Sequence, residues 1–189
     1  HGDSAWTDHY SLDAYAADLE AVRRGLKWER FALAAHSMGA RAALRFVSNG
    51  AAGLDSLALF DFYAADWGGR KPSSKTRPQP TYGEEEAILK RFRLEPPGTL
   101  LAPDALRALA RRGVRQGADG RWCWKFDWSA VGQSVVWDPS EPARADLPVL
   151  LVRGEASTTM PLWSFKSVLA ALPDARGVEI PGAHHHVTL

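Results

Sequence analysis

Ser37 is the residue with the clearest chemical potential in this sequence. It follows a short apolar stretch at 31–35 and precedes a helix-forming stretch at 40–47, so we predict a sharp turn from a strand into a helix. Such a turn projects one side chain from the carboxyl end of a sheet and requires small neighbours, which Ala35 and Gly39 supply. This placement is typical of an attacking serine.

A serine at such a turn still needs chemical support. The hydroxyl is a weak nucleophile unless a base lies within hydrogen-bond reach and a carboxylate orients that base. The following helix offers free N–H groups at its N-terminus, including that of Met38, which could stabilise a developing oxyanion. The sequence must therefore bring a base and an acid to Ser37 from elsewhere.

The elements that would position Ser37 alternate between helices and strands. An amphipathic helix is predicted at 11–25, and short apolar runs at 57–60, 148–152 and 177–180 are predicted strands, each flanked by turn residues. Alternation of this kind indicates a parallel sheet covered by helices. We expect an α/β fold with a doubly wound, mostly parallel sheet and helices on both faces.

One long segment interrupts the alternation. Residues 63–141 contain two predicted amphipathic helices, at 84–93 and 103–112, and a structureless loop of this length would be uncommon in a compact domain. We interpret the segment as an inserted helical lid. The core is then expected to consist of residues 1–62 and 142–189.

Aromatic residues gather near the end of this insertion. Trp124 and Trp128 are the members that we single out, and packing within the lid is the more common role for such a cluster. An apolar lid above an active site would also contact an acyl or aromatic substrate. We carry both tryptophans as candidate substrate-binding residues, together with His36, whose alternative role is to pack beside the serine turn.

Composition excludes several classes of partner. The 189 residues are 46% hydrophobic and 24% charged with a net charge of +1, and the basic residues are scattered. This distribution predicts neither nucleic-acid binding nor attachment to an anionic membrane, and favours a small-molecule partner. The single cysteine, Cys123, is compatible with the reducing cytoplasm. The oligomeric state is left open.

Three segments resemble the α/β-hydrolase superfamily, specifically its lidded, cofactor-independent esterase-like branch. They are His1-Gly2-Asp3-Ser4, Ala35-His36-Ser37-Met38-Gly39 and Pro181-Gly182-Ala183-His184-His185-His186. They follow the family's order, with serine before histidine. The resemblance implies an α/β-hydrolase fold, Ser37 as nucleophile, no cofactor, and His185 as base, because the family's histidine falls two residues after Pro-Gly. The family's first strands would precede His1 and its last helix would follow Leu189, so we expect a fragment.

The acid is where this sequence departs from the family. Most members have an aspartate three residues after a glycine that ends a late strand, whereas here Gly154 is followed at that distance by Ser157. Glu155 lies nearby, one residue after the glycine. A second arrangement resembles haloalkane dehalogenases, which carry the acid at the end of the strand after the nucleophile helix, where Asp61 stands here. We prefer Asp61 and keep Glu155 as the second choice; dehalogenase activity is not implied, because that chemistry uses an aspartate nucleophile.

The run of histidines from His184 to His186 invites a metal-site interpretation. Consecutive residues in extended chain point to alternate faces and chelate poorly, and no separate cluster completes a ligand set. We therefore predict no metal site.

The expected function is hydrolysis of a small-molecule acyl substrate, either a small or medium carboxylic ester or a related acyl compound. One alternative is a carbon–carbon bond hydrolase or acyltransferase that uses the same three residues. The other is a non-catalytic binding protein that has lost the acid.

Overall fold

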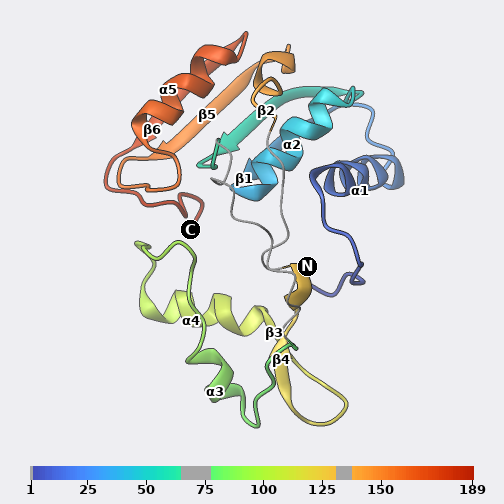
Figure 1. Cartoon of the computed structure of the whole chain (residues 1–189), viewed down its shortest axis with the longest axis vertical. Helices are drawn as coiled ribbons and strands as arrows, with labels where there is room; N and C mark the ends of the chain where they lie inside the picture. The colour runs from blue at the N-terminus through green and yellow to red at the C-terminus, as the bar shows by residue number, and fades with distance from the viewer. Residues whose placement is uncertain (1, 65–77, 131–137) are drawn as a thin grey trace. The chain divides into compact units, whose positions relative to one another are not determined.

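A computed structural model describes residues 2–64, 78–130 and 138–189 (Figure 1). His1 and the parts of the expected insertion at 65–77 and 131–137 lie outside the described residues. The contacts divide the chain into two compact units. In described residues, the sheet unit comprises 11–64, 98–100 and 138–189, and the hairpin unit comprises 2–10, 78–97 and 101–130.

The sheet unit contains four strands, all parallel, in the order β1-β2-β5-β6. Their bounds are β1 (Phe31–His36), β2 (Leu54–Phe60), β5 (Val149–Gly154) and β6 (Ala175–Ile180). The register pairs His36 with Phe60 and Phe60 with Val152, so β1 and β2 end level with each other while β5 continues to Gly154. The predicted mostly parallel sheet is confirmed, and residues that follow β1, β2 and β5 are brought to one edge.

Helices flank these strands, two of them at predicted places and the last, after β5, at a place where the sequence predicts no element. They are α1 (Leu12–Gly25), α2 (Met38–Ser48) and α5 (Leu162–Ala171), with a short 3₁₀ turn η2 (Pro142–Arg144) before β5. The hydroxyl of Ser11 accepts the N–H of Ala14 at 3.1 Å, which caps the start of α1. Arg23 and Arg24 lie in the last turn, where positive charge favours a helix end.

The core of the sheet unit lies on one face of the sheet. The steps from β1 to β2 and from β5 to β6 run in the same direction, so right-handed crossovers place α2 and α5 on the same side. Leu44 of α2 and Phe165 of α5 accordingly share a hydrophobic cluster with Leu59 and Leu151 of the sheet. We expected helices on both faces, whereas these two lie on one; Leu150, which points the other way, is 36% exposed.

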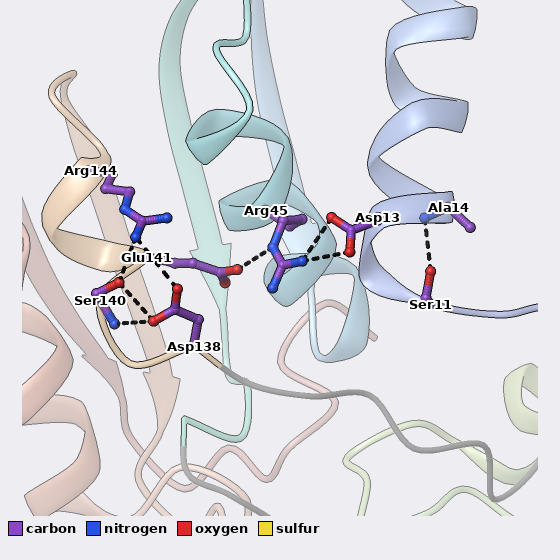
Figure 2. Close-up of polar contacts among 8 residues, drawn as sticks. All are labelled: Ser11, Asp13, Ala14, Arg45, Asp138, Ser140, Glu141 and Arg144. Carbon is purple, nitrogen blue, oxygen red and sulfur yellow. Dashed lines mark hydrogen bonds and ion pairs between the residues drawn. The ribbon is translucent and has the colours of Figure 1, made fainter.

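Charged residues tie the helices of the sheet unit together (Figure 2). Arg45 of α2 donates to both carboxylate oxygens of Asp13 in α1, at 2.7 and 2.8 Å, and also to Oε1 of Glu141, just before η2. Glu141 is fully buried, and burial raises the pKa of its carboxyl despite the neighbouring Arg45. The arrangement fixes the chain at the point where it returns to the sheet.

The hairpin unit is part helix and part strand. It contains α3 (Glu85–Leu89), α4 (Pro103–Arg112), the antiparallel strands β3 (Val114–Gln116) and β4 (Trp122–Trp124), and the 3₁₀ turn η1 (Trp128–Ala130). Both predicted helices are present, α3 shorter than expected, whereas the hairpin of β3 and β4 was not predicted. Its strands have three residues each, too short to show a period-two pattern.

Residues from the start of the chain belong to the hairpin unit. The hydroxyl of Tyr10 donates to Asp127 at 2.7 Å, and the indole N–H of Trp6 donates to the carbonyl of Lys125 at 3.2 Å. These contacts join residues that we expected to divide between core and lid. The lid role of residues 63–141 stays a prediction.

No helix in the described ranges is long and apolar enough to cross a membrane.

Candidate active site

Ser37 occupies the sharp turn between β1 and α2. Its backbone has φ 57° and ψ −123°, a left-handed conformation that a non-glycine residue adopts only when its surroundings hold it there. Its N–H donates to the carbonyl of Phe60 on the neighbouring strand at 3.0 Å. The hydroxyl forms no capping bond to α2. The strained turn therefore presents the side chain at the carboxyl edge of the sheet.

His185 meets that hydroxyl. Its Nε2 lies 2.9 Å from Oγ of Ser37, and its Nδ1 lies 2.8 Å from Oδ1 of Asp61. Because a carboxylate accepts but does not donate, Nδ1 carries the proton and the lone pair of Nε2 faces the serine O–H. The imidazole is only 3% exposed, so water competes little for either contact.

Asp61 is a fully buried carboxylate at the end of β2. Its Oδ2 accepts the N–H of Gly154 at 2.8 Å, and its Oδ1 accepts the hydroxyl of Ser157 at 2.6 Å as well as His185. The backbone at Asp61 also has positive φ, 36°. Every contact favours a charged, immobile carboxylate, because hydrogen bonds to it replace the water that burial removes.

Glu155, the second-choice acid, points elsewhere. Its Oε2 accepts the N–H of Gly182 at 2.8 Å, at the start of the loop that carries the histidines. The structure brings Asp61 and not Glu155 to His185. Glu155 comes directly after β5, and from there its side chain points to Gly182, whereas Ser157, two residues later, reaches Asp61.

The histidine loop packs directly on the end of β5. A Cβ built on Gly154 would lie 2.3 Å from the carbonyl oxygen of His184 and 2.4 Å from that of Ala183, so only glycine fits. Arg153 holds the following loop, donating to the carbonyls of Met160 and Glu155 at 3.0 and 3.1 Å. These contacts fix Ser157 and His185 on either side of Asp61.

Met38 is the first residue of α2, directly after Ser37. Its N–H is among those that a helix leaves without an intrahelical acceptor, as an oxyanion donor must be. At Gly39, by contrast, a built Cβ meets no heavy atom within 4 Å outside its own helix among the described residues. The described residues therefore leave room for a side chain at Gly39, although a small residue was expected there.

His36, the last residue of β1, lies against His185. Its Nε2 donates to the carbonyl oxygen of His185 at 2.9 Å, and the two ring centroids are 4.7 Å apart. Burial is the largest influence on the pKa of His36 and lowers it. The contacts of His36 therefore support the histidine loop.

The prediction of no metal site overlooked this neighbour. His36, His185 and His186 each offer a ring nitrogen, and the three nitrogens lie within 4.8 Å of one another. No separate cluster is visible in the sequence, because His36 lies about 150 positions before the consecutive histidines and is brought beside them only by the fold. The sheet supplies that third imidazole.

The candidate substrate-binding tryptophans both belong to the hairpin unit. Trp124 is 6% exposed, within a cluster that includes Ile88 and Val114, and Trp128 packs against the same cluster. Phe126 stacks between them, with centroid distances of 6.2 and 5.4 Å. Their visible contacts are those of a hydrophobic core.

Sequence reasoning missed two members of this site. Ser157 and Gly154 both contact the carboxylate of Asp61. In the sequence, the spacing of Gly154 and Ser157 indicates only that the usual aspartate is absent. A serine at that spacing, together with an aspartate at the end of β2, is the signal that could have found the pair.

Together these residues form a chain of hydrogen bonds in which the imidazole can take the serine proton while the carboxylate stays charged and orients the ring. Such a path can deprotonate Ser37 as it attacks a carbonyl carbon, and the helix N-terminus can accept the resulting oxyanion. The arrangement is suited to acyl transfer.

The sequence is similar to one protein family and to one characterised protein. The model of a family described as the alpha/beta hydrolase family matches residues 1–189. N-formylmaleamate deformylase from Pseudomonas putida is 46% identical over 52 residues, which are 28% of this chain and 19% of that protein. This chain thus aligns with about a fifth of that relative's length.

Solved structures match over nearly the whole chain. The crystal structure of E-2-(acetamidomethylene)succinate hydrolase is similar with a TM-score of 0.78 at 24% identity, covering 100% of this chain and 72% of that one. A crystal structure of an esterase from Mycobacterium tuberculosis has a TM-score of 0.79 at 20% identity, covering 98% and 65%. At these identities the similarity shows a shared fold.

Proposed function

The chain belongs to the alpha/beta hydrolase family, and from that premise we propose that it is part of a serine hydrolase that cleaves small or medium carboxylic esters or related acyl compounds. The single observation that carries this proposal is the pair of contacts at His185, 2.9 Å to Ser37 and 2.8 Å to Asp61. Serine, imidazole and carboxylate are the residue types that serine hydrolases use to transfer an acyl group to water.

The proposed reaction begins when Oγ of Ser37 attacks the acyl carbon while Nε2 of His185 takes its proton. Asp61 stabilises the imidazolium and keeps its ring oriented. The N–H of Met38 donates to the oxyanion of the tetrahedral intermediate. Collapse of the intermediate expels the leaving group, which receives the proton from His185, and an acyl-serine remains.

Water completes the proposed cycle. His185 takes a proton from a water molecule, the hydroxide adds to the acyl-serine, and collapse returns the proton to Oγ of Ser37. The products are a carboxylic acid and the free enzyme. The first and last proton transfers of the cycle run between Oγ of Ser37 and Nε2 of His185, which lie 2.9 Å apart.

Amides are a second candidate substrate class. The name N-formylmaleamate deformylase describes the removal of a formyl group from nitrogen, and E-2-(acetamidomethylene)succinate, which the other similar protein hydrolyses, carries an acetamido group. The same residues would serve, because His185 could protonate a departing nitrogen as well as an oxygen. Carbon–carbon bond cleavage and acyl transfer to another acceptor remain the alternatives on these residues.

A substrate panel tests the proposal. Chromogenic esters of two to eight carbons, N-formyl and N-acetyl enamides, and a β-diketone are offered to the protein and to Ser37→Ala. Turnover of an ester or amide that falls at least ~10³-fold in the variant is expected, since the nucleophile supplies most of the rate enhancement. Equal turnover by the two proteins would overturn it, and turnover confined to the β-diketone would favour the carbon–carbon alternative.

A further inference from the structure

Three imidazole rings meet at the carboxyl edge of the sheet. His36 ends β1, and His185 and His186 lie in the loop after β6. Ring centroids are 4.7 Å apart for His36 and His185, 5.9 Å for His36 and His186, and 4.9 Å for His185 and His186. The reaction proposed above uses one of these rings, that of His185, and gives the other two no chemical step.

The spacing of the rings is near that of a metal site. Imidazole nitrogens bound to one Zn²⁺ at ~2.0–2.1 Å stand about 3.3 Å apart in a tetrahedral arrangement, whereas these three lie within 4.8 Å. Side-chain rotation must close this gap before one ion can contact all three nitrogens. His36 and His186 are both partly exposed and would move, because Asp61 and Ser37 hold the ring of His185.

A buried carboxylate behind one imidazole is a second observation in favour of a metal. Metal-binding histidines commonly donate their other ring N–H to a carboxylate, which fixes the tautomer and makes the free nitrogen a better donor. His185 has this arrangement: Nδ1 donates to Asp61, and the lone pair is on Nε2. The residues that would activate a serine also prepare a metal ligand.

We propose that His36, His185 and His186 bind one divalent transition-metal ion of the Zn²⁺ class, and that the bound ion inhibits the enzyme. The ion is an inhibitor here and not a cofactor, because it binds the lone pair on Nε2 of His185, which must accept the proton of Ser37. Imidazole ligands favour Zn²⁺, Cu²⁺ and Ni²⁺ over Mg²⁺ and Ca²⁺, which prefer oxygen. The binding proposal depends only on the geometry of these side chains, whereas the inhibition proposal also depends on the proposed function.

Binding is tested without any substrate. Co²⁺ is titrated into the metal-free protein while its visible absorption is followed, and Zn²⁺ affinity is measured by calorimetry. One ion per chain is expected, with affinity at least tenfold weaker in His186→Gln. His184→Gln is the matched control, since His184 is the neighbouring histidine outside the cluster, and its affinity should equal that of the parent. Equal affinity in His186→Gln and the parent, or equal binding of Mg²⁺, would overturn the site.

Inhibition is tested on the substrate identified above. The rate of the parent should fall at least tenfold at Zn²⁺ concentrations that saturate the site and recover when EDTA is added. His186→Gln should need at least tenfold more Zn²⁺ for the same fractional loss relative to its own metal-free rate. An unaffected rate with the site saturated would overturn inhibition while leaving binding intact. A protein that binds Zn²⁺ but turns over no substrate would instead count against the proposed function.

Discussion

The hydroxyl of Ser157 lies 2.6 Å from Oδ1 of Asp61, the same carboxylate oxygen that accepts Nδ1 of His185. Ser157 follows β5 at the spacing where most family members have their aspartate, and Asp61 follows β2. The two alternative positions for the acid are therefore in contact, through the carboxylate oxygen that also accepts from His185. A carboxylate could serve His185 from one end of this hydrogen bond or from the other.

Exchanging the two side chains tests that relationship. Asp61→Ser alone should lower kcat by ~10³-fold or more, because nothing then orients the imidazole. Adding Ser157→Asp should recover at least a tenfold part of the loss, with rates measured on the best substrate of the panel. Asp61→Ser with Ser157→Asn is the control that restores bulk without charge. A Ser157→Asp exchange no better than this control would show that the positions are not interchangeable.

The identity of the acid is tested more simply by amide substitutions. Asp61→Asn should lower kcat by ~10³–10⁴-fold, because the amide stabilises the wrong tautomer of His185. Glu155→Gln, which keeps a group able to accept from Gly182, should stay within about threefold of the parent. Steady-state rates and circular dichroism of both variants are compared. A greater loss for Glu155→Gln than for Asp61→Asn would transfer the role to Glu155.

Close packing of the histidine loop on β5 predicts a sharp response at Gly154. Gly154→Ala places a methyl group against two backbone oxygens, so we expect about 1–3 kcal/mol of lost stability together with reduced activity. Gly25→Ala is the matched control, since a Cβ there meets no described heavy atom within 4 Å and alanine favours a helix. Urea unfolding of both variants measures the difference. Equal stability of the two would contradict the packing argument.

The buried carboxyl of Glu141 predicts a pH dependence of stability. Its Oε2 has no hydrogen-bond partner among the described residues, and burial raises the pKa above the ordinary value of 4.5. The folded state then binds the proton more readily than the unfolded state, so this group's contribution to stability falls as the pH rises from 4.5 through the raised value.

Glu141→Gln removes that ionisation. The free energy of unfolding of the variant minus that of the parent should therefore increase with pH, measured by urea denaturation from about pH 4 to about pH 7. The variant also loses the charge that Arg45 binds, which offsets the gain but does not reverse its trend. A difference that stays constant or decreases with pH would contradict the assignment.

Much of the sheet was predictable because its signals are local. The apolar runs of β1, β2 and β5 are flanked by turn residues, and the helix α1 has both a capping serine and a helical period. Short strands are harder, because three residues such as Val114–Gln116 carry no usable pattern. That is why the hairpin in the insertion was missed.

The parts of the site that lie in recognisable motifs were predictable from the sequence. Ser37, His185 and the choice between Asp61 and Glu155 came from motifs, and strand register decides which carboxylate arrives at the imidazole. The contact of His36 with His185 joins residues 149 positions apart, and the role of Ser157 depends on a hydrogen bond across two strands. Such pairings follow from how the sheet assembles, so no local pattern reports them.

The central claim is that Ser37 is chemically activated by the contacts at His185. A fluorophosphonate probe measures this directly, because it reacts quickly only with a serine whose proton has an acceptor. The parent should be labelled on Ser37, as located by peptide mass spectrometry, while labelling is absent in Ser37→Ala and at least ~10²-fold slower in His185→Ala. A folded parent that is not labelled, or labelling of Ser37 at the same rate without His185, would contradict the account.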